Sequence, residues 1–540
     1  MNKINNPKHV VRLPFLLAIA VATGILIGAT MIENPENKSL FSGIDKFREI
    51  MSYVERNYVD DVDTEELVET AITNMLEKLD PHTVYIPTED SELSRSQLEG
   101  NFDGIGIEFN IFKDTIYVVA PLSGGPSEKV GLLSGDKIIN VDGKTLAGVG
   151  VTSRDVFDNL RGPKGTKVMV DILRSGDDEL IPFEIIRDKI PQSSVDVSYM
   201  IDNAIGYIKV SRFSATTYDE FKKALVGLNE QGMQKLILDL TGNPGGYMDR
   251  AVNMADEFIN GQKMIVYTNG RETRYNSEHK AYRDGDFEKG ALIVLIDQGS
   301  ASASEIVAGA IQDNDRGLIV GRRSFGKGLV QMPITLRDGS ELRLTISRYY
   351  TPSGRSIQKS YGDENDDYDE DIFTRYENGE AFYADSIKVD ESLKFSTSKG
   401  RTVYGGGGIV PDVFVPLDTL GNSRYLTRLF TSNTIGEYVL NYYNQNQEKL
   451  EKTAYENYRA NFEVTEIMLT ELIDLAESNK LKFNEAQYST SKELIKLHLK
   501  AQIARRVWDN EGFYPIFNET HEILQAALKQ FDKAERLAKK

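Results

Sequence analysis

The chain has 540 residues, a formal net charge of −19 at pH 7, and an ordinary globular balance of 40% hydrophobic and 27% charged residues. At roughly 100–200 residues per domain, this length predicts several domains. Such an acidic chain is poorly suited to nucleic-acid binding, which needs basic patches that displace counterions from phosphates. The absence of cysteine excludes thiol catalysis, disulfides and cysteine-ligated zinc.

The N-terminus carries a long apolar run. Lys3, Lys8 and Arg12 precede Leu13–Ile32, which contains no charged residue and is long enough to cross a hydrocarbon core of about 30 Å. Basic residues in front of such a run favour a cytoplasmic N-terminus. We therefore expect residues 1–33 to be a single-pass signal anchor in a bacterial inner (cytoplasmic) membrane, with the rest of the chain on the periplasmic or extracytoplasmic side. A cleaved signal peptide is the alternative, and it would also place the rest of the chain outside the cytoplasm.

Residues 34–98 form a predicted helical region. Apolar residues recur there at helical spacing. They are Phe47, Ile50, Met51, Val54, Leu67, Ala71, Met75 and Leu79. Pro81, in the segment Leu79-Asp-Pro-His-Thr83, then breaks the pattern.

The sequence of residues 99–188 predicts a small β-rich module. Short strands are expected at Ile116–Val119 and Lys167–Ile172, with one helix near Ser153–Leu160. The run from Ser127 to Gly143 (SEKVGLLSGDKIINVDG) strongly resembles the core of a PDZ domain. The resemblance implies a β-rich domain that binds the free carboxyl termini of other proteins.

PDZ domains hold a terminal carboxylate with backbone N–H groups of a glycine-bearing loop, and they accept the peptide as an extra strand at an open sheet edge. Here the resemblance implies that Phe102–Gly106 is the loop that holds the carboxylate and that the peptide pairs with Ile105–Phe109. The implied peptide-binding residues are Phe102, Gly104, Ile105, Gly106 and Ile107. The alternative is that the two glycines only serve a tight turn.

Residues 189–420 predict an α/β core. Ile205–Val210, Leu236–Leu240 and Ala291–Ile296 are continuous apolar runs of strand length, and a helix-like stretch, Tyr218–Leu228, separates the first two. Such strands are typical of a layer that is buried on both faces. Residues 359–403 form a predicted insertion whose acidic run, 363–371, is expected to be solvated. Residues 421–540 are predicted to be helical and polar.

The segment Asp297–Ala310 follows a buried strand and opens a predicted helix. A serine at that position lies at the positive end of the helix dipole, where free backbone N–H groups can stabilise an oxyanion. The alternative is structural, because Ser302 and Glu305 have the spacing of a capping box, in which each side chain satisfies the other's backbone donor.

The search for a catalytic base leads to a lysine. None of the five histidines lies in the α/β region beside an obvious carboxylate, and no His-Glu-x-x-His metal motif is present. Lys327 stands between two glycines before an apolar strand, and burial can lower a lysine pKa enough for it to act as a base. Gln331 can orient its amine. The alternative is a surface lysine in a glycine turn.

Together these residues resemble the carboxyl-terminal processing (tail-specific) serine protease family, which combines a PDZ domain with a Ser–Lys dyad. The match covers roughly residues 40–360 and resumes at Gly407–Asp412. The ordered motifs are LDPHT (79–83), the PDZ core, DLTGNPGG (239–246), GSASASE (299–305), GKGLVQ (326–331) and YTPSGRSIQ (350–358).

The resemblance assigns roles. Ser302 is the implied nucleophile, Lys327 the general base 25 positions later, and Gln331 its supporting residue. Asp313 is a further supporting position. The implied oxyanion donors are the backbone N–H groups of Ala303 and of Gly245 or Gly246. No cofactor or metal is expected.

The implied fold is a crotonase/Clp-like α/β protease core with an inserted PDZ domain, N-terminal helices and a C-terminal helical extension. The implied partners are protein or peptide substrates with free carboxyl termini, and a second copy in a homodimer. Thr241 departs from the family pattern, which often has arginine there. The competing functions are an idle PDZ scaffold and a crotonase-like acyl-CoA enzyme. Retention of Ser302, Lys327 and Gln331 argues against the scaffold, and the export signal and PDZ module argue against the acyl-CoA enzyme.

Overall fold

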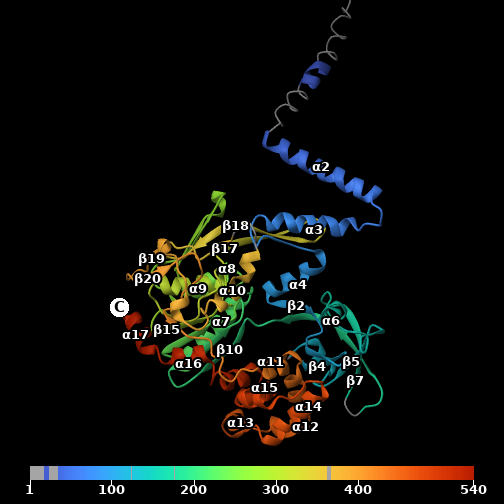
Figure 1. Ribbon diagram of the computed structural model, residues 1–540, viewed down its shortest axis with the longest axis vertical. Helices are drawn as coiled ribbons and strands as arrows, with labels where there is room; N and C mark the ends of the chain where they lie inside the picture. Colours follow the sequence, from blue (N-terminus) through green and yellow to red (C-terminus); the bar gives the residue numbers. More distant parts are fainter. Residues whose placement is uncertain (1–16, 24–34, 123, 175–176, 362–365, 540) are drawn as a thin grey trace, which may run out of the picture. The chain divides into compact units, whose positions relative to one another are not determined.

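The computed structural model describes residues 17–23, 35–122, 124–174, 177–361 and 366–539 (Figure 1). The chain divides into an N-terminal unit, residues 1–76, and a large unit, residues 77–540. Each unit is described by itself.

The N-terminal unit is helical, as its sequence predicts. Residues 17–23 are helical, and α2 (Pro35–Asn57) and α3 (Thr64–Glu77) follow. The rest of the apolar run Leu13–Ile32 lies outside the described residues. Among the helices that are described, none is both long enough and apolar enough to span a bilayer.

The large unit begins with β1 (Val84–Ile86) and α4 (Thr88–Glu99), and then enters a small β-module. Its six-stranded sheet has the order β3-β4-β5-β7-β8, with β6 paired to β5, so β3 lies at an edge. A two-stranded ribbon, β2-β9, joins the module to the rest of the unit. The elements are β2 (Asn101–Gly104), β3 (Ile107–Phe112), β4 (Thr115–Pro121), α5 (Pro126–Val130), β5 (Lys137–Val141), β6 (Lys144–Thr145), α6 (Ser153–Leu160), β7 (Lys167–Leu173), β8 (Ile181–Ile186) and β9 (Asp188–Pro191).

The predicted elements of this module are confirmed. The strands expected at Ile116–Val119 and Lys167–Ile172 lie within β4 and β7, and the expected helix is α6. Helix α6 begins where it does because Thr152 and Asp155 form a capping box.

The central sheet has six strands in the order β10-β11-β12-β15-β16-β21. Strands β11 to β21 run parallel, and β10 is antiparallel at one edge. The three predicted strands and the predicted helix are confirmed as β11, β12, β15 and α7. The bounds are β10 (Val195–Met200), β11 (Ile205–Val210), α7 (Thr217–Glu230), β12 (Lys235–Asp239), α8 (Met248–Asp256), β15 (Ala291–Ile296), α9 (Ala303–Asp313), β16 (Leu318–Gly321) and β21 (Val413–Phe414).

Helices cover both faces of this sheet, which explains its continuous apolar strands. Leu236 and Leu238 of β12 pack with residues of α7, α8 and α9, whereas Ile237 between them packs with Ile523 and Phe531. The latter two belong to α16 (Glu522–Leu528) and α17 (Phe531–Lys539). The C-terminal region, predicted as a separate polar extension, therefore supplies one of the two layers that bury the central sheet.

A second sheet has the order β1-β18-β13-β14, with β17 also paired to β18. Its strands are β13 (Met264–Gly270), β14 (Ser277–Lys280), β17 (Leu329–Thr335) and β18 (Glu341–Tyr350). The insertion contains α10 (Asp366–Glu377) and a hairpin of β19 (Lys394–Ser396) and β20 (Thr402–Tyr404). Short 3-10 turns lie at Thr273–Tyr275, Ala384–Ser386 and Glu391–Leu393.

The acidic insertion differs from its prediction as a solvated segment. Tyr368 of α10 is only 3% exposed. Asp371, within the acidic run, forms ion pairs with Lys359 (3.1 Å) and Arg375 (2.9 Å). Part of this run is therefore docked on the protein, because buried partners neutralise its charge.

The remaining C-terminal helices form a cluster with its own core, which includes Leu429, Leu472, Ile495 and Leu499. They are α11 (Arg424–Thr431), α12 (Thr434–Glu451), α13 (Tyr455–Asn461), α14 (Glu466–Ser478) and α15 (Glu485–Phe517).

Helix α15 connects two parts of the large unit. Arg506 donates to the Val119 carbonyl in the β-module (2.9 Å), and Tyr514 donates to the Asp196 carboxylate in β10 (2.8 Å). Between these contacts the helix is kinked, with non-helical dihedral angles at Trp508 and Asp509.

We predict that Phe531→Ala lowers the free energy of unfolding by about 3 kcal/mol, because it opens a cavity between α17 and the central sheet. Phe531 is 4% exposed, and the control Leu420→Ala removes a side chain that is 83% exposed. Urea unfolding of both variants checks this. Equal midpoints for the two would mean that α17 does not belong to the core.

Candidate active site

Ser302 lies in a tight turn between β15 and α9. Its φ of +53° and ψ of −111° are unusual for a residue other than glycine. Two side chains hold this conformation. The Glu305 carboxylate accepts the Ser302 N–H (2.8 Å), and the Tyr349 hydroxyl donates to the Ser302 carbonyl (3.1 Å). The strained conformation is therefore stabilised at the peptide groups on both sides of Ser302.

The three serines of the motif have different environments. Ser300 Oγ donates to the Leu240 carbonyl (2.8 Å), and Ser304 Oγ donates to the Asn243 carbonyl (2.9 Å). Both side chains are fully buried. Ser302 is half-buried, and its hydroxyl makes no helix-capping hydrogen bond. Of these three described serines, only Ser302 has a hydroxyl that is not held by a backbone carbonyl.

Glu305 makes more hydrogen bonds than a helix cap requires. Besides the Ser302 N–H, its carboxylate accepts the N–H groups of Gly326 (2.8 Å) and Lys327 (2.9 Å) and the hydroxyl of Ser324 (2.5 Å). Burial raises the pKa of this carboxyl to about 7, although the four hydrogen bonds act in the opposite direction. Glu305 thus joins the start of α9 to the loop that carries the lysine.

Tyr349 makes the same connection from the other side. Its hydroxyl lies 2.5 Å from the Lys327 carbonyl as well as 3.1 Å from the Ser302 carbonyl. The backbones of Ser302 and Lys327 are therefore adjacent, as the sequence predicts. No hydrogen bond joins the two side chains themselves in the part of the chain that is described.

Lys327 is half-buried, and its amine donates to Gln331 Oε1 (2.8 Å). Burial lowers the pKa of Lys327, and the charge of Arg343 lowers it further, while Asp80 and Glu305 act in the opposite direction. The predicted contact with Gln331 is present, and the alternative of a freely solvated surface lysine does not fit this environment.

The LDPHT segment completes the surroundings of the lysine. Gln331 Nε2 donates to the His82 carbonyl. The Asp80 carboxylate fixes this turn by accepting the N–H groups of His82 and Thr83, both at 2.8 Å. Burial is the main reason that the pKa of His82 is lowered to about 4, with the Lys327 charge second. The sequence does not predict that the His82 carbonyl binds Gln331, since the two residues are far apart in the chain.

The glycine loop after β12 packs directly on the nucleophile turn. A Cβ on Gly245 would lie 2.8 Å from both the Ala301 oxygen and the Ser302 Cβ, and 2.9 Å from the Ala303 nitrogen. Buried Asn243 positions the loop, because its carbonyl accepts the Ala301 N–H (2.9 Å). Its side-chain oxygen accepts the Gly245 N–H (2.9 Å). Gly245, Gly246 and Ala303 are therefore near Ser302, as the sequence predicts.

Thr241, which departs from the family pattern, has a cation beside it. Lys209 Nζ contacts the Thr241 carbonyl (2.5 Å) and hydroxyl (2.8 Å) and the buried Asp239 carboxylate (3.1 Å). A lysine from the neighbouring strand thus provides positive charge next to the position where related chains often have arginine.

Asp313 lies at the far end of α9. It forms a fully buried ion pair with Arg355 (2.7 Å), and it accepts the Ser353 hydroxyl (2.6 Å). This pair fixes the loop that places Gln358, whose side-chain oxygen accepts the Gly328 N–H (2.7 Å). Asp313 therefore contacts the lysine loop only through intermediate residues.

The predicted peptide-binding residues of the β-module lie on two elements. Phe102 and Gly104 belong to β2, whereas the turn itself consists of Ile105 and Gly106, and Ile107 opens edge strand β3. Gly106 has a φ of +72°, so the turn needs its glycine. The predicted five-residue loop is therefore shorter in the structure, because Phe102–Gly104 pair with β9.

A cavity of about 440 Å³ lies beside this edge. It is lined by residues of α4, by Phe102, and by Phe157 and Arg161 at the end of α6. The Arg161 guanidinium lies over the Phe102 ring at 4.6 Å and over the Phe157 ring at 4.3 Å. Arg154 is a second cation in the lining, and the cavity also holds five carboxylates, those of Glu89, Asp90, Glu92, Asp103 and Asp158.

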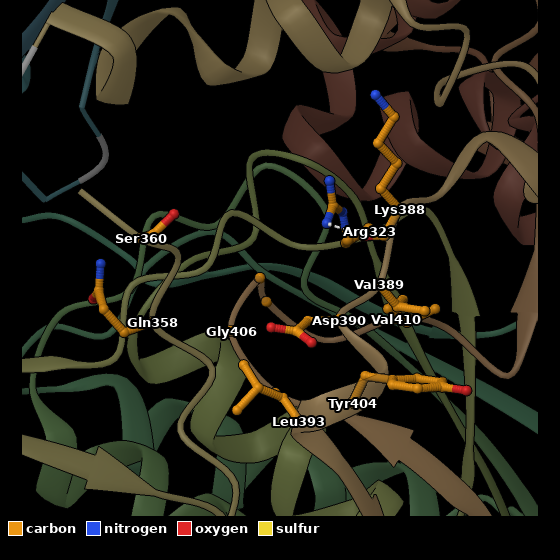
Figure 2. Close-up of a pocket in the computed structure, with 13 residues that line it drawn as sticks. Arg323, Gln358, Ser360, Lys388, Val389, Asp390, Leu393, Tyr404, Gly406 and Val410 are labelled. Atoms are coloured by element: carbon orange, nitrogen blue, oxygen red, sulfur yellow. Dashed lines mark hydrogen bonds between the residues drawn. The ribbon is translucent and has the colours of Figure 1, made fainter. Parts of the chain in front are cut away.

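Another cavity, of about 460 Å³, lies beyond the lysine loop. Figure 2 shows Arg323 and Lys388 on one side of it and Gln358 and Ser360 on the other. Neither Ser302 nor Lys327 lines it, so it is separate from the reacting groups. In the described part of the chain, no cluster of three or more His, Asp or Glu side chains is arranged to hold a metal ion.

Comparison with known proteins finds family matches along most of the chain. Residues 204–367 match the model of peptidase family S41, and residues 104–185 match a PDZ domain. Residues 28–90 match the N-terminal domain of the activating protease CtpB, and residues 425–509 match a family of unknown function. A carboxy-terminal-processing protease of Bartonella bacilliformis is 36% identical over 348 residues, which are 64% of this chain and 79% of that protein.

The chain belongs to peptidase family S41. It is a carboxy-terminal processing serine protease with a PDZ domain, and an idle scaffold is not favoured. The carboxy-terminal processing protease CtpB of Bacillus subtilis is 35% identical, with coverage of 58% of this chain and 66% of that protein. The solved photosystem II D1 C-terminal processing protease is 26% identical and has a TM-score of 0.34, with coverage of 69% and 88%.

We predict that Gly245→Ala lowers the kcat of this S41 protease at least about 100-fold, because the glycine loop must move away from Ser302, an effect as large as the loss of an oxyanion donor. The new methyl group would overlap Ser302, and φ at Gly245 is +98°. The matched control is Gly242→Ala, which also has a positive φ (+68°) but has no atom within 4 Å of its Cβ. Peptide cleavage by the two variants is the measurement. Similar rates would show that the loop does not pack on the nucleophile as described.

Proposed function

We propose that Ser302 is the nucleophile of this protease, that Lys327 is its general base, and that Gln331 orients the lysine amine. The observation that carries the proposal is the joint anchoring of Ser302 and Lys327 by Glu305 and Tyr349. The neighbouring serines support the choice of Ser302, because their hydroxyls are already held by backbone carbonyls.

In the proposed reaction, neutral Lys327 accepts the Ser302 proton while Ser302 Oγ attacks the carbonyl carbon of a peptide bond. The lysine then gives the proton to the leaving amine as the C–N bond breaks, which leaves an ester on Ser302. Water, deprotonated by the same lysine, hydrolyses this ester and releases the new carboxyl terminus. A lysine can do this only with a lowered pKa, and the burial of Lys327 provides that.

The backbone N–H of Ala303 and one from the glycine loop are the proposed oxyanion donors. Gly245 already donates its N–H to Asn243 Oδ1, so it can reach an oxyanion only after that bond breaks. No hydrogen bond engages the Gly246 N–H within the described residues. We therefore favour Gly246, with Gly245 shaping the loop. Asp313 is proposed to support the site indirectly, through its ion pair with Arg355.

The PDZ domain is proposed to bind the carboxyl-terminal tail of a substrate. The turn Ile105–Gly106 would hold the terminal carboxylate, and the tail would pair with edge strand β3. Phe102 and Gly104 would then form the wall of the site rather than its loop.

We further propose that Leu13–Ile32 anchors the protein in a bacterial cytoplasmic membrane, with the protease on the extracytoplasmic side. The support is the length of this uncharged run and the basic residues before it. A homodimer is proposed from the family resemblance alone.

The decisive experiment compares cleavage of an unstructured peptide with an apolar free carboxyl terminus by the parent, Ser302→Ala and Lys327→Ala. We expect both variants to lose activity by a factor of about 1,000 or more, while Lys452→Ala, which removes an exposed lysine, cleaves like the parent. An amidated peptide should be cleaved more slowly. Activity retained by Ser302→Ala would contradict the nucleophile assignment.

The pH dependence of kcat should show the base. Because Lys327 must be neutral, activity rises with pH through its pKa, and burial places this acid limb below 10.5. Lys327→Arg should be inactive across the range, since a guanidinium does not lose its proton. A kcat that falls as pH rises from 7 to 9 would rule out a lysine base.

A further inference from the structure

Helix α10 of the acidic insertion contacts the loop that carries Lys327. Arg375, which is 7% exposed, donates to the Ser324 carbonyl (2.8 Å) and to the Phe325 carbonyl (3.2 Å). These carbonyls lie directly before Gly326 and Lys327 in the chain. The insertion is therefore a neighbour of the base and not a remote surface segment.

The same helix reaches the LDPHT turn through Tyr368. Its hydroxyl lies 2.7 Å from His82 Nε2, and the two rings meet edge to face at 5.1 Å. The Tyr368 ring also packs against Phe325 of the lysine loop, at 5.9 Å. One buried side chain thus contacts both segments around the base.

Charged residues secure Tyr368 in this position. The Lys359 ammonium lies 3.9 Å from the centre of the Tyr368 ring, and it donates to the Tyr368 carbonyl (2.8 Å). It also pairs with Asp371 one turn further along α10. The acidic run therefore helps to hold the start of α10 against the active site.

The path from Tyr368 to the base passes through His82 and Gln331. The amide nitrogen of Gln331 donates to the His82 carbonyl, and as a result its oxygen faces the Lys327 amine. A neutral amine has one lone pair, so the N–H that it donates to Gln331 restricts where that lone pair points. The position of the His82 carbonyl therefore affects the direction in which Lys327 can accept a proton.

We propose that Tyr368 is a positioning residue for the general base, which it aligns by holding the His82 turn that orients Gln331. The inference rests on the proposed Ser302–Lys327 dyad. It assigns the insertion, which lies outside the common family motifs, a part in the reaction.

The test is Tyr368→Phe in the purified full-length chain, which removes the hydroxyl and keeps the ring. We expect kcat to fall about three- to tenfold, the effect of one hydrogen bond, with KM unchanged within about twofold. Looser packing admits water to Lys327 and raises its pKa, so the acid limb of kcat should move to higher pH. The other charges that act on Lys327, those of Arg343, Asp80 and Glu305, stay in place.

The matched control is Tyr376→Phe on the same helix, because Tyr376 is 51% exposed. It should change neither kcat nor the pH profile. A second variant, His82→Ala, keeps the carbonyl that binds Gln331 but removes the ring that Tyr368 holds. The double variant Tyr368→Phe/His82→Ala should then lose no more activity than His82→Ala alone, since both changes break one contact.

The outcomes separate the inference from the dyad. If Lys327→Ala is inactive but Tyr368→Phe has the kcat and pH profile of the parent, the positioning role is wrong and the dyad stands. A lower melting temperature for Tyr368→Phe with kcat and pH profile unchanged would also overturn the inference, because the contact would then serve folding alone. Activity in Lys327→Ala would reject the dyad itself.

Discussion

The buried carboxylate of Glu305 is the interaction on which the site depends. Removing a carboxylate from water costs several kcal/mol, and here four donors offset part of that cost. Two of these donors are the N–H groups of Ser302 and Lys327. The length of the Glu305 side chain thus sets the separation between the nucleophile turn and the lysine loop. If either segment moved away, the buried carboxylate would lose hydrogen-bond donors.

The local parts of this site could be predicted from the sequence. The buried strand before Ser302, the helix after it, and the glycines beside Lys327 each follow from short patterns. Glu305 was recognised as a cap because capping depends on a spacing of three residues. Its bonds to Gly326 and Lys327 were not foreseen, since they join segments about 20 residues apart that meet only after the sheets have formed.

The same reasoning explains the other differences. Tyr368 was placed in a solvated acidic run because composition reports average polarity, and one buried tyrosine hardly changes that average. Helices α16 and α17 were assigned to a polar extension, although Ile523 and Phe531 cover the sheet. An amphipathic helix reveals that it has an apolar face but not which surface that face will cover. The PDZ turn was predicted too long for a related reason, because the pairing of β2 with β9 joins residues about 85 positions apart.

The kink in α15 has a mechanical consequence. A straight helix resists bending, so two bodies bonded to one helix would be obliged to rotate together. Here Arg506 is bonded to the PDZ domain and Tyr514 to the protease sheet, while Trp508 and Asp509 interrupt the helical geometry between them. The two residues at the kink, where the helical geometry is interrupted, are therefore the place where α15 would bend most easily if the PDZ domain moved.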